Sequence, residues 1–245
     1  MNEYNGNAIC ENCGAELNDD FCSKCGNPKN LKRIDGNYII SEIGSVFNFD
    51  KGILYTIKEL IIRPGEAVQK FIHKNRKRLV KPILFLIVCS LIYSLTEQFL
   101  KFEEPYINAE GFGNSTLATI FGWIKKNFGY VNIFMSIFIA GWIKLFFKKY
   151  NYNIFEIIIL LCFVLGIGML IHTTFGVIDN ITDINVLQFG GIISIIYTSW
   201  AIGQFFGKKK KWNYMKALIA YLLGMITFYF LVVILGVGID LILKV

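Results

Sequence analysis

The sequence has little of what enzyme chemistry usually depends on. It has only two histidines in 245 residues, and it has no P-loop, H-E-x-x-H helix, nucleophile elbow or dinucleotide-binding glycine fingerprint. Of its six cysteines, four lie in the first 25 residues, and the other two, Cys89 and Cys162, are single residues within hydrophobic runs. Because nucleophiles and bases are so few, we expect a protein that is not an enzyme.

The composition is too apolar for an ordinary soluble domain. Hydrophobic residues make up 54% of the chain, the mean hydropathy is +0.50, and the apolar residues come in long blocks. The net charge of +7 does not indicate a nucleic-acid binder, because 13 of the 25 Lys and Arg residues precede Pro82. Residues 1–9 are polar and lack the apolar core of a signal peptide, so we expect the first span to act as the insertion signal.

Five apolar blocks are long enough to cross a bilayer, which takes about 20 residues of helix. They comprise residues 83–100, 131–147, 154–178, 189–206 and 217–243. Alternate connecting segments hold 21 and four of the 25 basic residues, which by the positive-inside rule places the N-terminus in the cytosol and the C-terminus outside. The sequence therefore predicts an all-α polytopic membrane protein, with five transmembrane helices in residues 82–245.

Residues 1–27 are predicted to form a small zinc ribbon. The sequence has two C-x2-C-G turns, Cys10 to Gly14 and Cys22 to Gly26, and eight residues separate Cys13 from Cys22. Each turn directs two thiolates at one ion, and the glycine can adopt the positive φ that turns backbone N–H groups toward the sulfurs. Four thiolates in a tetrahedron suit a closed, structural Zn²⁺ site with Cys10, Cys13, Cys22 and Cys25 as ligands. Phe21 is expected to supply most of a very small core.

Three other uses of the four cysteines stay open. Disulfides would stabilise so small a unit, but they do not suit a reducing cytosol. Iron in a rubredoxin-like site uses similar turns. A catalytic C-x-x-C pair usually accompanies a βαβ pattern, which the surrounding sequence lacks. Structural zinc is the favoured interpretation.

Residues 28–81 are predicted to form a linker followed by amphipathic helices. A first short helix is expected from Tyr38 to Phe47, and a second from an N-cap at Asp50 to a stop at Pro64. A third opens at Pro64 and carries Val68, Phe71, Ile72 and Leu79 on one side. Helices with an apolar stripe and basic residues elsewhere, leading directly into a span, fit best in the headgroup layer of the membrane.

Basic residues at the predicted cytosolic side are candidate contacts for anionic lipid headgroups or a protein partner. The set comprises Arg63, Lys74, Arg76, Lys77, Arg78, Lys81, Lys208, Lys209, Lys210 and Lys211. The alternative, that these cations only enforce orientation, stays open. Nucleic acid is not expected as a partner, because no aromatic residue is interleaved among residues 73–81 to stack on bases.

One combination of motifs resembles a known family. The cysteine turns are followed by Thr56-Ile57-Lys58-Glu59-Leu60, then Arg63-Pro64-Gly65, then a basic segment that leads to Pro82. This arrangement is similar to a family of uncharacterised bacterial zinc-ribbon membrane proteins, domain of unknown function 3667. The resemblance implies a bacterial inner-membrane protein and implies no activity. The layout of five spans with a cytosolic head is also similar, at the level of the fold alone, to Yip1-type trafficking proteins.

Ionisable residues within or near the spans are the place to look for transport. They are Glu97, Lys144, Glu156, His172, Asp179 and Asp240. All except His172 fall close to the end of a block, where side chains can reach the interface. Two hypotheses follow. The first is a non-enzymatic platform whose zinc ribbon and basic helices bind a protein or lipid partner, with a role in envelope regulation or assembly. The alternative is a small transporter or channel with the zinc ribbon as a sensor or gate, and with His172 or Glu156 facing water.

Overall fold

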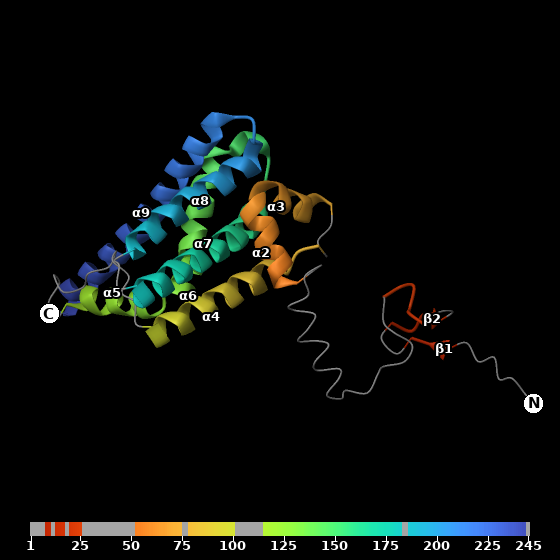
Figure 1. Cartoon of the computed structure of the whole chain (residues 1–245), viewed down its shortest axis with the longest axis horizontal. Helices are drawn as coiled ribbons and strands as arrows, with labels where there is room; N and C mark the ends of the chain where they lie inside the picture. The colour runs from red at the N-terminus through yellow and green to blue at the C-terminus, as the bar shows by residue number, and fades with distance from the viewer. Residues whose placement is uncertain are drawn as a thin grey trace, which may run out of the picture. The chain divides into compact units, whose positions relative to one another are not determined.

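The computed structural model describes residues 8–10, 13–17, 20–25, 52–74, 78–100, 115–182 and 186–243 (Figure 1). The chain divides into two compact units, Met1–Val46 and Phe47–Val245. The expected linker, the helix from Tyr38 to Phe47, Asp50, Arg76 and Lys77 lie outside the described residues. Each unit is considered separately.

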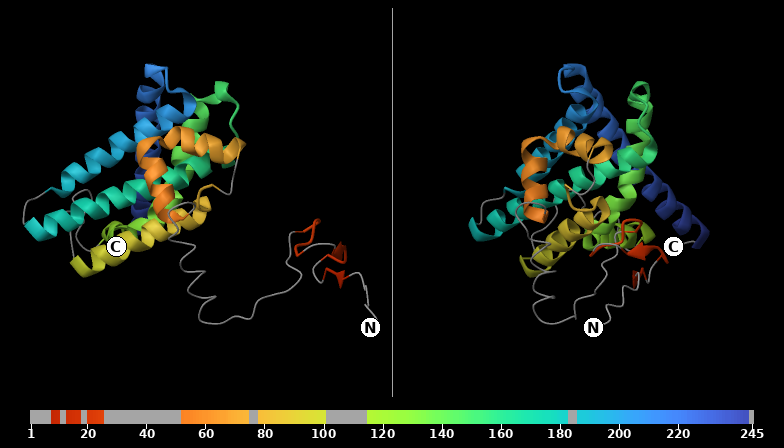
Figure 2. Two further views of the ribbon diagram at one scale, coloured as in Figure 1. Left: turned by 45° about the vertical axis from the view of Figure 1, so that its right-hand side comes forward. Right: turned by 90° about the vertical axis from the view of Figure 1, so that its right-hand side faces the viewer.

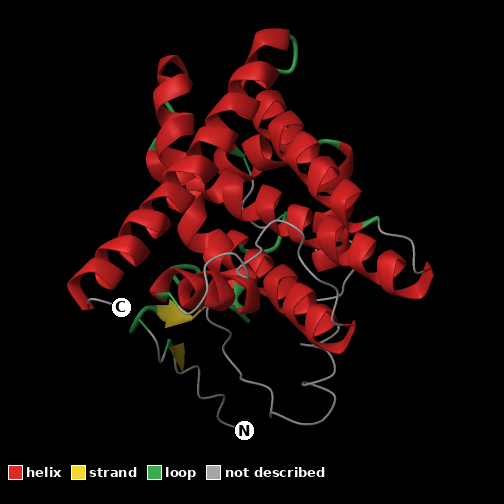
Figure 3. Ribbon diagram, turned by 90° about the vertical axis from the view of Figure 1, so that its left-hand side faces the viewer, coloured by secondary structure: helices red, strands yellow, loops and turns green. Residues whose placement is uncertain are grey.

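The described part of the first unit is built on a short antiparallel pair of strands (Figure 3). Strand β1 (Ala8–Ile9) pairs with β2 (Glu16–Leu17), with Ala8 opposite Leu17 and Ile9 opposite Glu16. The first cysteine turn connects the two strands. Phe21 is 63% exposed, so the expectation that it supplies the core is wrong. The buried side chains are instead those of Cys10 and Cys22, against which Cys13 and Ala15 pack.

The second unit is helical over its described residues (Figure 1). Two ten-residue helices, α2 (Ile53–Ile62) and α3 (Pro64–His73), precede the spans. Five helices are long and apolar enough to cross a membrane, as the sequence predicted: α4 (Pro82–Leu100), α6 (Phe128–Phe146), α7 (Ile154–Thr182), α8 (Leu187–Gly207) and α9 (Lys211–Leu243). A shorter helix, α5 (Thr116–Lys126), precedes α6, and a 3-10 turn, η2 (Lys148–Tyr150), follows it.

The cation-rich segments of the second unit meet at one end of the bundle. In α3, Glu66 pairs with Lys208 after α8, and Tyr150 of η2 contacts Asn213 in the first turn of α9. We call this end, comprising the described residues 52–74, 78–81, 147–153 and 207–213, the basic end. At the opposite end, Asn180 donates to the carbonyl of Leu100, and α5 is joined to α9. Alternate connections therefore lie at opposite ends, as the charge pattern requires.

Helix α3 packs closely on α7 and α8 (Figure 2). Its buried residues include Val68, Phe71 and Ile72, and the ring of Phe71 meets that of Phe163 on α7 edge to face, 5.4 Å between centroids. The apolar stripe of α3 is therefore covered by protein, whereas the sequence predicted that it lies in the headgroup layer. On α2, an apolar set stays exposed, comprising Leu54, Ile61 and Ile62. An interfacial position for α2 stays a prediction.

The start of α3 is fixed by two features of the Arg63-Pro64-Gly65 motif. Pro64 occupies the first helical position, where its missing N–H costs no hydrogen bond. The Gly65 N–H donates to Gln204 Oε1 on α8 at 2.7 Å. A Cβ at Gly65 would lie 2.4 Å from the backbone nitrogen of Phe205 and 2.6 Å from the carbonyl carbon of Gln204. Only glycine fits this backbone contact without moving one of the two helices.

Gly65→Ala is therefore expected to destabilise the protein by about 1 to 3 kcal/mol, the usual cost of overpacking a tight contact. In thermal unfolding of the detergent-purified protein, its apparent melting temperature should fall below that of the parent. Gly141→Ala is the matched control, because it makes the same change within α6 at a site with no neighbouring atom within 4 Å. Equal melting temperatures for the two variants would contradict the contact.

Candidate functional site

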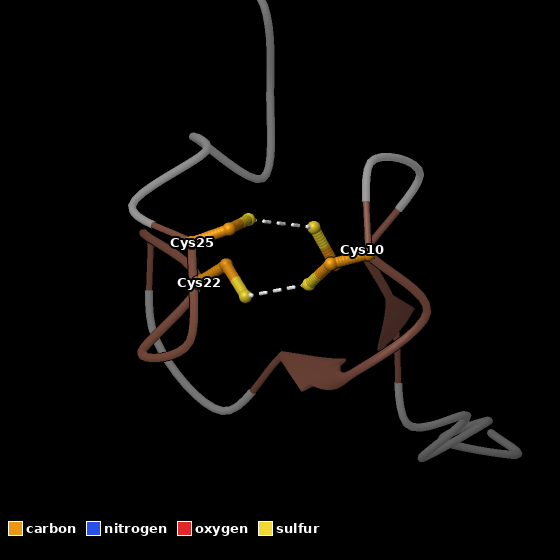
Figure 4. A group of neighbouring side chains, drawn as sticks. Cys10, Cys22 and Cys25 are labelled. Carbon is orange, nitrogen blue, oxygen red and sulfur yellow. Dashed lines mark hydrogen bonds between the residues drawn. The ribbon is translucent and has the colours of Figure 1, made fainter.

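The four cysteine sulfurs of the first unit converge on one point. Their Sγ atoms all lie within 4.8 Å of one another. Cys10 and Cys25 approach to 3.5 Å, and Cys13 and Cys22 approach to 3.6 Å, so each close pair joins the two turns (Figure 4). Gly14 adopts a φ of +71°, the conformation expected after a C-x2-C turn, and its N–H donates to the Cys10 carbonyl at 2.9 Å. Two segments that are eight residues apart thus present four ligands to a single position.

The spacing of these sulfurs fits a tetrahedral thiolate site. Sulfurs placed about 2.3 Å from a zinc ion at tetrahedral angles are about 3.8 Å apart. The observed approaches of 3.5 and 3.6 Å are close to this value and far longer than a disulfide bond of about 2.05 Å. None of the six cysteines, all of which the structure describes, forms a disulfide bond. The residues present could therefore hold a metal ion.

Crowding of the four thiols favours their protonated form. A backbone hydrogen bond from Ala15 lowers the pKa of Cys13, but its bonds to the other thiols, together with burial, outweigh this and raise the pKa to about 12. A bound divalent ion favours the thiolate form instead, because the thiolate rather than the thiol is the metal ligand. Metal binding here therefore competes with protons and weakens as the pH falls.

A second cluster lies around the buried carboxylate of Glu59. It belongs to the segment before the first span, described over residues 52–74 and 78–81, which we call the junction. The Glu59 side chain is 8% exposed and pairs with Arg63 at 3.2 Å and with Arg78 at 3.4 Å. Arg78 also donates from Nε to the Tyr55 hydroxyl at 2.6 Å and lies over the Tyr55 ring. A buried carboxylate is stable only when it is paired. These contacts therefore hold the segment that precedes α4 against α2.

Further hydrogen bonds hold the junction together and connect it to α8. The buried Thr56 hydroxyl donates to the Gly52 carbonyl and accepts the Val80 N–H, both at 3.1 Å. The Tyr197 hydroxyl on α8 donates to the Leu60 carbonyl at 3.1 Å, and Gln69 donates to the Phe205 carbonyl at 2.5 Å. Residues in and near the motifs at Thr56 to Leu60 and Arg63 to Gly65 thus link α2, α3 and α8.

The predicted lipid- or partner-contacting cations fall into three groups. Arg63 and Arg78 are paired with Glu59, and their side chains remain 44% and 40% exposed. Lys208 pairs with Glu66 at 3.0 Å. The others among the described residues are exposed and comprise Lys74, Lys81, Lys209, Lys210 and Lys211. Contact of these residues with a ligand stays a prediction.

The carboxylates near the span ends bind helix N-termini. Glu156 and Asn153 exchange two hydrogen bonds, at 2.8 and 2.9 Å, in a capping box that starts α7. Asp179 accepts the N–H groups of Val186 and Leu187 at the start of α8, and Asp240 accepts the Thr116 N–H at the start of α5. Negative charge stabilises a helix N-terminus, so these positions have a structural explanation. His172 is buried in α7, at 8% exposure.

Sequence reasoning missed one group at the basic end. Asn213, 2% exposed, donates to the Tyr150 hydroxyl at 2.9 Å and to the Phe206 carbonyl at 3.1 Å. The ring of Phe206 stacks on Phe147 at 4.0 Å between centroids. The cations of Lys149 and Lys210 lie 5.4 and 5.8 Å from the Tyr150 ring centre. Spacing along the chain gave no signal, because Tyr150 and Asn213 are 63 residues apart.

Glu59→Gln is expected to lower the stability of the protein by about 1 to 2 kcal/mol, because it breaks both arginine pairs at a buried position while the half-exposed guanidiniums can turn to water. The control is Glu66→Gln, which breaks an exposed pair worth at most about 1 kcal/mol. Melting temperatures of the two variants, measured in the same detergent, test this ranking. An unchanged melting temperature for Glu59→Gln would remove the structural role assigned to the cluster.

Comparison with known proteins finds a family model that is similar to the junction. Residues 50–94 match the family model described as "Protein of unknown function (DUF3667)". This range includes the motifs at Thr56 to Leu60 and Arg63 to Gly65, and it does not include the four cysteines. No curated protein and no solved structure matches the chain, and the similarity to Yip1-type proteins gains no support. The resemblance predicted from the sequence is thereby confirmed, and the family that this chain matches, over its junction and first span, is DUF3667.

Proposed function

We propose that this chain is a non-enzymatic protein of the bacterial inner membrane, in which a structural Zn²⁺ ion folds a small cytosolic platform for a protein or lipid partner. The observation that carries the proposal is the convergence of Cys10, Cys13, Cys22 and Cys25 in a unit in which, among the described residues, the buried hydrophobic side chains are cysteines. Units this small rarely fold without a metal or a disulfide, so the ion supplies the stability that the core lacks.

Zinc is favoured over the other uses of four cysteines. A site of four thiolates is saturated, so it leaves no coordination position for a substrate or for water and suits a structural role. Free thiols and metal ligation are both compatible with a reducing cytosol, whereas disulfides are not. Iron remains the second candidate for the same ligands.

The cytosolic placement is supported by the distribution of charge. The basic end holds the cation-rich connections of the bundle, and cytosolic segments of inner-membrane proteins carry the excess of Lys and Arg. The first unit precedes this end in the chain, so it belongs on the same side. With a cytosolic N-terminus, an odd number of spans supports a periplasmic C-terminus.

The junction forms a rigid part of the membrane domain. Helices α2 and α3 are held to α8 by Gly65, Gln69 and Tyr197 and to the start of α4 by Glu59 and Thr56. A partner bound at the cytosolic face would therefore engage a rigid part of the membrane domain. This favours a role in holding a partner at the membrane, in envelope regulation or assembly.

The transporter or channel alternative requires an ionisable side chain exposed to water inside the bundle. Glu156 is engaged in a helix cap, and His172 is buried, which favours packing roles for both. Single cysteines placed along α7, on a background without Cys162, test the alternative by labelling with a water-soluble maleimide. Labelling of a continuous stripe through the middle of α7 would favour transport over the platform.

Cys10→Ser/Cys13→Ser is expected to reduce the metal content from about one ion per chain to none, because two thiolates do not hold a structural zinc ion. Elemental analysis of the purified protein measures this and identifies the metal. The variant should still insert in the membrane and should lose partners in crosslinking pull-downs. Cys89→Ser is the control and should retain both metal and partners. If the double variant keeps every partner, the platform role is wrong.

The orientation is tested separately by a reporter fused before Cys10. A reporter that is active only in the cytosol should give full signal, and one that is active only in the periplasm should give none. The opposite result would place the four cysteines in an oxidising compartment and would remove the basis for zinc.

A further inference from the structure

We propose that the Tyr150 cluster at the basic end is a binding site for the phosphate headgroup of an anionic glycerophospholipid, such as phosphatidylglycerol or cardiolipin. This inference deepens the proposed function, since it names the lipid class, and it rests on the proposed membrane setting. It does not depend on the metal. The cluster consists of Tyr150 and Asn213 with six surrounding lysines, namely Lys148, Lys149, Lys208, Lys209, Lys210 and Lys211.

The cluster is assembled from two connections that are distant in the sequence. Lys149 belongs to η2 between α6 and α7, and Lys210 belongs to the turn between α8 and α9. Both ammonium groups lie within 6 Å of the centre of one aromatic ring, that of Tyr150. One ring thus attracts two cations that come from different connections.

The centre of the cluster is rigid. The Asn213 amide is buried, and its two hydrogen bonds fix the Tyr150 hydroxyl on one side and the end of α8 on the other. Phe206, stacked on Phe147, holds η2 against the end of α8. The two lysines are therefore placed on a prepared surface, which reduces the entropy lost when they bind a common anion.

The positive charge is largely uncompensated. Lys208 pairs with Glu66, whereas the other five lysines have no carboxylate within 4 Å among the described residues of the second unit. A phosphodiester has the opposite charge and several acceptor oxygens, so it can bridge more than one ammonium group. Each lysine close to an anionic leaflet adds to the attraction.

The position favours a lipid over a soluble anion or an acidic protein. Helix α9, a candidate span, begins at Lys211, so the cations stand where a span emerges from the hydrocarbon. Trp212 follows at 67% exposure and Met215 at 50%, which provides an apolar surface beside the charges. Tryptophan is enriched at the headgroup level of membranes. Charge and an exposed aromatic side chain thus coincide at the depth of a lipid phosphate.

The test uses the full-length protein in nanodiscs of phosphatidylcholine with increasing fractions of phosphatidylglycerol or cardiolipin, and measures retained lipid by native mass spectrometry. Lys149→Ala/Lys210→Ala should weaken retention about 30-fold, since two lysine contacts are lost. Tyr150→Leu should weaken it as well, at unchanged net charge, because it removes the ring that gathers the lysines. Lys58→Ala/Lys70→Ala is the charge-matched control, with one lysine on α2 and one on α3, and it should bind as the parent does.

Three results would overturn the proposal. Equal weakening by the control double variant would mean that bulk charge, and not this cluster, retains lipid. Parent-like retention by Tyr150→Leu, with folding verified by circular dichroism, would mean that the ring does not organise a site. Competition by millimolar inorganic phosphate, or binding of an acidic protein in place of lipid, would assign the cluster to another ligand. Metal content is measured in every variant, so a failed lipid site is distinguished from a failed metal centre.

Discussion

The backbone contact between α3 and α8 at Gly65 determines the arrangement of the whole junction. Because no side chain separates the two helices there, Gln204 can receive the Gly65 N–H, and the apolar side of α3 comes to rest on α7. The chain then returns past α2, where Glu59 holds Arg78 at the entrance to α4. The segment that precedes the first span is in this way made part of the bundle of candidate spans.

Carboxylates near the ends of membrane helices are often taken as signs of transport. Here Glu156, Asp179 and Asp240 each accept N–H groups that no helix can satisfy internally. In a medium without water such orphan donors are expensive, so a carboxylate at this position contributes to the structure of the bundle. Each of the three residues shows that an ionisable side chain near a span can have a purely structural use.

The five spans could be predicted because about 20 apolar residues in a row have few other uses, and the cysteine spacing likewise indicated the ligand set. The capping box at Asn153 and Glu156 was readable from its spacing and was overlooked. Other features were out of reach. The pairing of Glu59 with Arg78, and that of Tyr150 with Asn213, joins residues far apart in the chain, and periodicity reports only which face of a helix is apolar. Periodicity could not tell whether lipid or protein covers α3. The sequence also could not show that Phe21, an aromatic residue next to a cysteine, is exposed and not part of a core.

The bond between Gly65 and Gln204 spans 139 residues, which has a consequence for biogenesis. A ribosome that adds about 5 to 20 residues per second needs roughly 7 to 28 seconds to make that length of chain. During this interval α3 already exists, but the part of α8 on which it packs has not yet been synthesised. Its hydrophobic side must be sheltered by something else, and the surface of the bilayer is the nearest apolar phase. The amphipathic pattern of α3 therefore suits two successive environments, first lipid during translation and then protein in the finished molecule.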